Sequence, residues 1–186
     1  MAAATRWSTY IERFIPVCER LVVDGRIGAC GITGIGIPEC ILEALGESSR
    51  PAAIQCITID SPGELKYFAG PRRAREIIAA SKNGGAGALG IRPVQGGALT
   101  DTLDRDLPPD HGVVPDFKRS AAFRAPSREL GTSPAALARY ALSMPGVDTV
   151  VLCCKNRKEV LECVTAAEAG PLEPAVVARI DAAFVA

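Results

Sequence analysis

The stretch Gly87-Ala88-Leu89-Gly90-Ile91-Arg92-Pro93-Val94-Gln95-Gly96-Gly97 decides the fold. Its first five residues form a short, continuous apolar run, which is typical of a strand buried on both faces of a parallel sheet. Arg92 and Pro93 end the run, and a glycine-rich loop follows. In parallel α/β sheets ligands lie at the carboxyl ends of the strands, so this loop is a place to look for chemistry.

Three more runs of this kind occur along the chain, and segments with helical periodicity separate them. A strand followed by a helix, four times over, predicts an α/β fold with one parallel sheet and right-handed crossovers. The predicted strands are Arg26–Ile32, Ala53–Ile59, Gly87–Ile91 and Asp148–Cys153, and the predicted helices are Pro38–Leu45, Pro71–Lys82, Asp116–Phe123, Pro134–Ser143 and the segment after Asn156.

A further helix is predicted at each end of the chain. Apolar residues recur at steps of three and four over Trp7–Val23, and Pro16 inside this stretch should kink or split the helix. The closing helix begins near Pro174. The helix that follows Asn156 carries an apolar stripe that should face the protein interior. The stripe comprises Val160, Leu161, Val164 and Ala167.

The chain length limits the architecture. A closed (β/α)₈ barrel takes about 250 residues, and the 186 residues of this chain suffice for about half of one. We therefore predict a single domain over 1–186, with a leading helix in 1–24, four βα units in 25–170 and a closing helix in 171–186. A sheet of four strands leaves its inner face partly open to water, so we expect poor solubility or an oligomer.

Composition excludes several classes of protein. Lys and Arg together number 21, Asp and Glu number 21, and the hydrophobic fraction is 48%, which is ordinary for a soluble globular chain. Net neutrality argues against a nucleic-acid partner, and no apolar run is long enough for a membrane span. The seven cysteines form no evident disulfide framework, and a single His and no C-x-x-C motif make a zinc site improbable. Reduced thiols and no secretory signal predict a cytoplasmic protein.

Several polar residues near the strand ends are candidate ligands. Gln55 lies within the second strand, where its amide must find a partner, either a ligand amide or a neighbouring backbone group. Arg92 either pairs with a carboxylate or faces a cofactor. In the loop Pro93–Ala98, Gly96 and Gly97 allow close approach of a phosphate, although a plain tight turn explains them as well.

The start of the helix after the fourth strand is a second candidate site. Asn156 and Glu159 have the spacing of a capping box, with Asn in place of Ser or Thr. Lys155, Arg157 and Lys158 add positive charge to the positive end of the helix, which would suit a 2′-phosphate, unless this is only a solvated helix start. His111 lies in a Pro- and Asp-rich loop, where exposure without function is the simpler interpretation.

Taken in order, these segments resemble the carboxyl-terminal half of an aldo-keto reductase, strands five to eight of its barrel. Gly25–Gly34 resembles the family's fifth-strand motif GKIRAIGVSN, and Ala53-Ile54-Gln55 resembles the sixth strand, which carries a Gln. Ala88–Thr100 is similar to the seventh strand and its GG-x-L loop. Ser133–Val147 resembles SPAELALRWALSHPGV, and Val150–Glu162 resembles the eighth strand with GxKNxxQLEEN.

The resemblance implies a carbonyl reductase that uses NADP, with NAD as the other possible cofactor. It transfers hydride from the reduced form, NADPH or NADH, to a small aldehyde, ketone or sugar-type substrate. The family's catalytic Asp, Tyr, Lys and His lie on the first four strands, and Tyr10, Tyr67 and Tyr140 match no part of that motif. No catalytic residue and no metal ligand is therefore predicted in this chain. The resemblance assigns cofactor binding to Thr33, Gln55, Arg92, Pro93, Gly96, Gly97, Lys155, Asn156, Arg157 and Glu162.

Some positions depart from the family pattern. Thr33-Gly34 stands in place of the Ser-Asn pair that holds the carboxamide, so the hydroxyl is kept and the amide is lost. Cys153 replaces a small Gly before the anion-binding helix, and Glu162-Cys163 replaces Glu-Asn near the adenine.

Three functional hypotheses follow. The first is an aldo-keto reductase-type oxidoreductase sequence that is truncated or is completed by a second polypeptide, and that is inactive alone. The second is a half-barrel that binds a nucleotide or assembles, for example as a homodimer, without redox chemistry. The third is a different small-molecule enzyme on a flavodoxin-like sheet.

Overall fold

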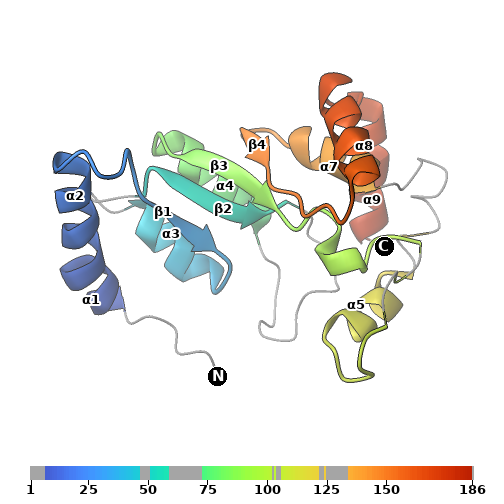
Figure 1. Ribbon diagram of the computed structural model, residues 1–186, viewed down its shortest axis with the longest axis horizontal. Helices are drawn as coiled ribbons and strands as arrows, with labels where there is room; N and C mark the ends of the chain where they lie inside the picture. The colour runs from blue at the N-terminus through green and yellow to red at the C-terminus, as the bar shows by residue number, and fades with distance from the viewer. Residues whose placement is uncertain are drawn as a thin grey trace.

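The computed structural model describes residues 7–46, 51–58, 73–101, 103, 106–121, 124 and 134–185. Four strands form one sheet in the order β1-β2-β3-β4, and every neighbouring pair is parallel (Figure 1). The predicted arrangement of four parallel strands is confirmed. A flavodoxin-like sheet would place its first strand between the second and third, so the sequential order excludes that alternative. The strands are β1 Gly31–Gly34, β2 Ala53–Ile57, β3 Gly87–Ile91 and β4 Thr149–Val150.

The two central strands match the predicted positions better than the two edge strands. β3 has the predicted bounds, and β2 begins at Ala53 as predicted, whereas Ile59 lies outside the described residues. The prediction for β1 was wrong at its start, because the N–H groups of Arg26 and Ile27 bond to the carbonyl of Leu21 at the end of the preceding helix. β4 is also shorter than predicted, with two residues.

The leading helix runs through Pro16 and changes its winding just before it. α1 (Trp7–Thr9) continues into a π-helical turn, Tyr10–Phe14, and then into α2 (Ile15–Val23). The N–H of Ile15 bonds to the carbonyl of Tyr10, five residues back. Pro16 lies in the first turn of α2, where a missing N–H costs little. The predicted disturbance at Pro16 therefore takes the form of a π turn and does not split the helix.

One face of the sheet is covered by α3 (Pro38–Gly46) and α4 (Ala74–Asn83), which lie side by side against β2 and β3. Alternate strand residues point to this face, and Ile54 and Cys56 of β2 are 0% and 1% exposed. They form the main core with residues of both helices and of β3, namely Ile41, Leu45, Ile77, Ile78 and Ala88, and with Met144 from the segment before β4.

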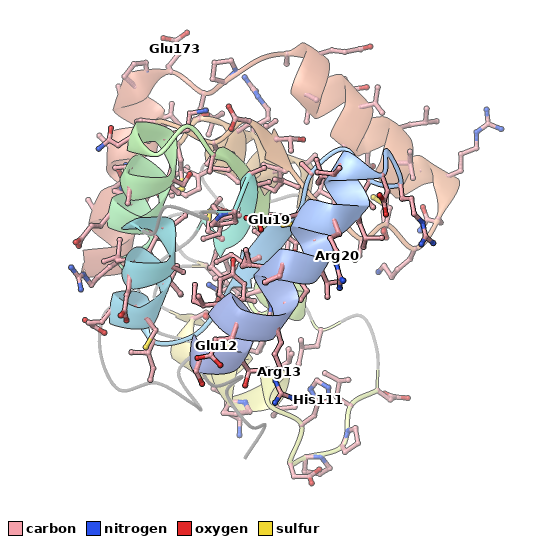
Figure 2. All side chains as sticks on the ribbon, turned by 90° about the vertical axis from the view of Figure 1, so that its left-hand side faces the viewer. Glu12, Arg13, Glu19, Arg20, His111 and Glu173 are labelled. Atoms are coloured by element: carbon pink, nitrogen blue, oxygen red, sulfur yellow. The ribbon has the colours of Figure 1, made fainter. Side chains whose placement is uncertain are left out.

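The opposite face of the sheet is less covered. Gln55 and Leu89, which alternate with the core residues, are only half-buried, and Thr33 is exposed. Figure 2 views the molecule from the β1 end, where the π-helical turn carries the charged side chains of Glu12 and Arg13, and α2 carries those of Glu19 and Arg20. The face that would line the interior of a closed barrel is thus open beside β1.

A second group of helices packs at the β4 end of the sheet and comprises α7 (Pro134–Leu142), α8 (Arg157–Glu168) and α9 (Pro174–Val185) (Figure 1). Leu137 and Tyr140 of α7, Ile180 of α9 and Leu99 form a separate buried cluster there. The short helix α5 (Val113–Arg119) and the 3₁₀ turn η2 (Gln95–Gly97) follow β3.

α8 contradicts the predicted inward stripe. No residue of α8 is buried, and Val160, Leu161 and Val164 are 46%, 54% and 47% exposed, while Ala167 is exposed too. Periodicity correctly places these side chains on a stripe, but no described element covers it. At the carboxyl end of α8, the guanidinium of Arg139 from α7 donates to the carbonyls of Ala169, Gly170 and Pro171. This cation satisfies carbonyl groups that a helix end leaves without partners.

Within the described residues, no helix combines the length and the apolarity that crossing a bilayer requires.

Candidate functional site

Thr33 and Gln55, two of the predicted cofactor residues, meet on the open face of the sheet. The parallel register pairs them across β1 and β2. The hydroxyl of Thr33 donates to the side-chain oxygen of Gln55 at 3.3 Å. Gln55 therefore takes a side-chain partner from the neighbouring strand. A hydroxyl and an amide on one open surface are groups that can recognise the amide of a ligand.

Gly34 explains one departure from the family pattern. It is buried in β1, and a Cβ added there would lie 2.6 Å from Cδ1 of Ile54. Ile54 is itself fully buried in the main core. An Asn at this position would displace that core residue, so the lost amide and the close packing of β1 on β2 belong together.

The loop after β3 has a constrained backbone. Arg92, Gln95, Gly96 and Gly97 all have positive φ, at +57°, +46°, +67° and +99°. Such a conformation is ordinary for glycine and uncommon for Arg and Gln. The N–H of Gln95 bonds to the carbonyl of Arg92 at 2.9 Å, which closes a tight turn. The prediction of a turn is thus confirmed, and the phosphate contact stays a prediction.

The side chains in this loop are arranged in two ways. Pro93 is buried and Gln95 is 0% exposed, whereas Arg92 is exposed at the end of the strand. Arg124, which the sequence did not indicate, donates to the carbonyls of Ala98 and Phe117 and lies over the Phe117 ring. It thereby joins the loop to α5. No sequence pattern marks this role, because it depends on a contact between distant segments.

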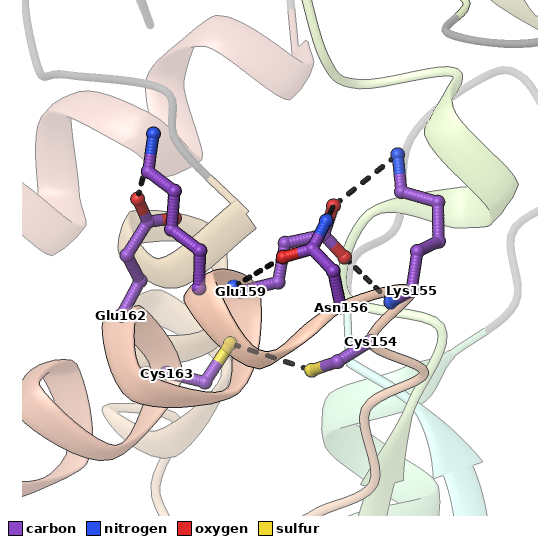
Figure 3. Close-up of polar contacts among 7 residues, drawn as sticks. Cys154, Lys155, Asn156, Glu159, Glu162 and Cys163 are labelled. Carbon is purple, nitrogen blue, oxygen red and sulfur yellow. Dashed lines mark hydrogen bonds and ion pairs between the residues drawn. The ribbon is translucent and has the colours of Figure 1, made fainter.

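The Asn156 N-cap of the predicted capping box is confirmed at the start of α8, whereas the reciprocal bond of Glu159 goes to the N–H of Lys155 in place of that of Asn156 (Figure 3). The N–H of Glu159 donates to Oδ1 of Asn156 at 3.0 Å, and the carboxylate of Glu159 accepts from the N–H of Lys155 at 2.7 Å. The Lys155 N–H bond is the largest contribution that lowers the pKa of Glu159 below its ordinary value. Glu159 thus holds the loop from β4 against the first turn of α8.

The positive charge at this helix start is partly balanced within the chain. Nζ of Lys155 lies 3.3 Å from Glu159, and Nζ of Lys158 lies 3.8 Å from Glu162. Among the described residues, Arg157 has no carboxylate within ion-pairing distance. The argument that all three cations need an external anion is therefore weakened, and Arg157 remains the strongest anion-binding candidate of the three.

Part of this cluster lines a groove of about 840 Å³ between α7 and α8. Arg157, Lys158, Leu161 and Glu162 contribute to it from α8, and Arg139 contributes from α7. Thr33, Gln55 and the loop after β3 do not line this groove. The predicted residues thus form three groups: the Thr33–Gln55 pair, the Arg92–Gly97 loop and the start of α8.

The Thr33–Gln55 pair lies within β1 and β2, and the other two groups follow the carboxyl ends of β3 and β4. β1 to β4 are three inter-strand steps apart, roughly 14 Å at about 4.8 Å per step. Amide and hydroxyl groups lie at one end of the sheet, and glycine backbone and cations lie at the other. This donor set fits a dinucleotide, whose carboxamide needs the former and whose phosphates need the latter.

Other candidate side chains have structural roles. Tyr140 is buried, and its hydroxyl donates to Asp181, which Arg75 also binds at 2.7 Å. Burial is the main cause that raises the pKa of Tyr140. His111 is exposed, and its Nδ1 accepts from the N–H of Val113 at 3.2 Å (Figure 2). Tyr67 lies outside the described residues. Among the residues that the structure describes, no cluster of three or more potential metal ligands occurs.

One contact near the site was missed from the sequence. The thiols of Cys154 and Cys163 lie 4.0 Å apart, on the loop before α8 and on α8 itself (Figure 3). The spacing of Cys154 and Cys163 around the helix start could have indicated this contact. Asn156 begins the helix two residues after Cys154, and Cys163 follows seven residues later, about two helical turns.

Comparison with known proteins gives concordant results. Residues 2–184 match the model of the aldo/keto reductase family. The apo form of aldo-keto reductase AKR11C1 from Bacillus halodurans is similar in structure, with a TM-score of 0.67 and 24% identity. Its holo form gives a TM-score of 0.64, also at 24% identity. No curated protein matches the sequence.

These structural matches cover most of this chain but only little more than half of each solved protein. The two alignments cover 94% of this chain, and they span 57% of the apo-form chain and 56% of the holo-form chain. The similarity to these structures agrees with four βα units arranged as part of a (β/α)₈ barrel. On the match over residues 2–184, the chain belongs to the aldo/keto reductase family.

Proposed function

We propose that this chain forms the cofactor-holding part of an NAD(P)H-dependent oxidoreductase that transfers hydride between the nicotinamide and a small aldehyde, ketone or sugar-type substrate. One observation carries the proposal. Three groups of polar residues lie along the parallel sheet: the amide-recognising pair Thr33–Gln55 lies within β1 and β2, and the anion-recognising groups follow β3 and β4. Family membership supports the reaction class.

Each group has a distinct task in this proposal. Thr33 and Gln55 would bind the carboxamide. Gly96 and Gly97 lack side chains and would let the phosphates approach the loop closely, near Pro93 and Arg92, although the N–H of Gly97 already donates to the carbonyl of Val94 at 2.8 Å. Lys155 and Asn156 would position the remainder of the dinucleotide, with Glu162 near the adenine. Arg157 would bind a 2′-phosphate, which favours NADP over NAD. When bound, the cofactor supplies the hydride.

The proton donor for carbonyl reduction is proposed to come from residues outside these 186. The chain aligns with little more than half of each solved relative. Its described tyrosines do not serve as donors in this proposal, because Tyr140 is committed to Asp181. We expect the purified 186-residue chain to bind nucleotide without reducing aldehydes. Consumption of NADPH in the presence of a small aldehyde, followed by its absorbance, would contradict this division of roles.

Cofactor binding is tested by calorimetric titration of the 186-residue chain with NADPH and, in parallel, with NADH. Arg157→Ala should weaken NADPH binding about tenfold and leave NADH binding unchanged, since a charge-assisted hydrogen bond is worth roughly that factor. Gln55→Ala should weaken both nucleotides to the same extent, because both carry the carboxamide.

Arg20→Ala is the matched control, since Arg20 is an exposed cation on α2 at the other end of the molecule (Figure 2). It should leave both affinities unchanged. If neither nucleotide binds, or if Arg157→Ala weakens both equally, the proposed orientation along the sheet is wrong.

An assembly function is the second candidate, and the open edges of the sheet favour it. Within the described residues, β1 pairs only with β2 and β4 only with β3. Exposed apolar side chains lie beside each edge, Val17 and Val23 on α2 and Leu161 and Val164 on α8. We propose that a second copy, or a polypeptide carrying four further βα units, covers these surfaces. Sedimentation of the pure chain tests the homodimer, and a single species near 19.5 kDa would exclude it.

A cytoplasmic location remains part of the proposal, as the cysteine pattern of the sequence predicts.

A further inference from the structure

Two thiols lie within reach of each other at the start of α8. Sγ of Cys154 is 4.0 Å from Sγ of Cys163, both residues are half-buried, and both thiols are free (Figure 3). Cys154 belongs to the loop that leaves β4, and Cys163 lies on α8. The neighbouring Cys153 is exposed. The two sulfurs that face each other belong to two local elements, the loop after β4 and the helix α8.

The surrounding contacts keep these two segments together. Glu159 accepts from the N–H of Lys155, and Asn156 accepts from the N–H of Glu159, so the loop is fixed to the first turn of α8 on both sides of the cap. A disulfide needs a sulfur–sulfur distance of about 2.05 Å. The sulfurs must therefore approach by roughly 2 Å, which movement of the short loop bearing Cys154 can provide.

The two thiols differ in their surroundings. Burial is the main cause that raises the pKa of Cys163 to about 11, and the hydrogen bond with Cys154 adds to it. Cys163 is therefore almost wholly protonated at neutral pH. Cys154 lies outside the helix, on the loop before α8. We therefore assign Cys154 as the attacking thiol and Cys163 as the resolving one.

We propose that Cys154 and Cys163 are a redox modification site, at which a low-molecular-weight disulfide such as oxidised glutathione converts the two thiols into a reversible intramolecular disulfide. The Cys154 thiolate attacks one sulfur of the small disulfide and releases one small thiolate. Cys163 then gives its proton to solvent and attacks the Cys154 sulfur, which releases the second. The protein loses two electrons and two protons, and the small disulfide becomes two thiols.

The disulfide would also change the proposed nucleotide site, and this part rests on the proposed function. Drawing Cys154 toward Cys163 shifts the next residue, Lys155, away from its bond to Glu159. Loss of one capping interaction is a factor of about five in an equilibrium. We expect oxidation to weaken NADPH binding by about fivefold, and a dithiol reductant to restore it.

The test equilibrates the 186-residue chain with a series of ratios of oxidised to reduced glutathione. Remaining thiols are then alkylated, and the peptides are mapped by mass spectrometry. The expected result is a Cys154–Cys163 cross-linked peptide that disappears after dithiothreitol. Cys154→Ser should abolish it. Cys40→Ser, at an exposed thiol on α3, is the matched control and should leave it unchanged.

Two results would overturn the proposal. One is full alkylation of Cys154 and Cys163 at every ratio, and the other is preferential pairing of Cys163 with Cys153. Both are read from the unaltered chain, so the proposal stays testable even if Cys154→Ser fails to fold. If the cross-link forms while NADPH binds to neither form, the modification site stands and the proposed function fails. If NADPH binds equally to both forms, the modification site stands without control over the cofactor.

Discussion

The centre of the sheet and the α8 end are built from the same strand–helix pattern, yet different interactions hold them. Around β2 and β3, Ile54 and Ile78 are fully buried between the sheet and α3 and α4. At the other end, α8 buries none of its residues, and polar contacts secure its two ends. An identical pattern therefore gives a packed layer where neighbours exist on both sides and an open one where they do not.

The difference shows that the region that stabilises the fold and the region that carries the predicted cofactor residues are separate. Apolar burial concentrates at α3 and α4, which carry none of the predicted cofactor residues. The start of α8, by contrast, carries Lys155, Asn156, Arg157 and Glu162 and has almost no apolar anchoring. Regions stabilised by few buried contacts open at low free energy, and binding elements are often drawn from them.

The largest expected effect compares one core residue with one α8 residue. Ile54→Ala should lower the free energy of unfolding by about 2–5 kcal/mol, because it removes fully buried atoms and leaves a cavity. Leu161→Ala, at a side chain that is 54% exposed, should change it by less than about 0.5 kcal/mol. Urea unfolding followed by circular dichroism measures both, and equal losses would show that α8 is covered after all.

Next in size is a dependence of stability on alkaline pH at Cys56. Burial raises the pKa of this core thiol to about 11, from a reference value of 9.0. Because the folded-state pKa is the higher one, the stabilisation is complete below pH 9 and is lost as pH rises to about 11. Two pKa units correspond to a loss on the order of 2 kcal/mol.

The measurement is urea unfolding at several pH values across that window. Cys56→Ala should be less stable than the unaltered chain below pH 9, because it leaves a small cavity, and it should lack this part of the pH slope. If the slope persists unchanged in Cys56→Ala, the titrating group lies elsewhere, and the closed core does not control it.

A smaller effect is expected from the cap of α8. Asn156→Ala removes the acceptor for the N–H of Glu159 and should cost about 1 kcal/mol in unfolding free energy. Asn156→Ser restores an acceptor and should recover most of that loss. If α8 depends on apolar packing instead, alanine and serine will give the same stability.

The smallest effect concerns the exposed carboxylate that joins β4 to the packed layer. Asp148 accepts from Nζ of Lys82 at 2.8 Å and from the N–H of Ala88 at 2.8 Å. The Lys82 hydrogen bond is the main cause that lowers the pKa of Asp148. Its contribution to stability is therefore present above the unfolded-state pKa and is lost as pH falls through the folded-state value.

Asp148→Asn keeps an acceptor for Ala88 and removes the charge, so we expect a loss of about 0.5 kcal/mol at neutral pH. Glu12→Gln, in the π-helical turn before α2, is the matched loss of one exposed carboxylate. The two variants should differ in acid-induced unfolding, and identical acid profiles would show that the Asp148 contacts add nothing.

The same comparison explains which predictions succeeded. β3 and the start of β2 were predicted correctly because central strands are predominantly apolar and have two partners. β1 was predicted to begin too early, because Arg26 and Ile27 have strand-like neighbours but bond to Leu21. Sequence periodicity registers a residue's local pattern and carries no information on competing backbone partners.

For the site, single residues could be predicted but their contacts could not. Thr33 and Gln55 were both expected to bind a cofactor, and the parallel register then brought them together. The capping box was predictable because it depends on residues three positions apart. The exposed stripe of α8 and the Cys154–Cys163 approach depend on which elements are near, which a pattern along the chain does not contain.

Arg139 has a mechanical consequence for α8. Its guanidinium ties the carboxyl end of the helix to α7, whereas the contacts described at the other end join residues 154–163 to one another. Thermal displacement of α8 should therefore increase in amplitude from the pivot near Gly170 toward Lys155. The residues proposed to grip the nucleotide would then move most, together with their own loop, while the far end of the helix stays in place.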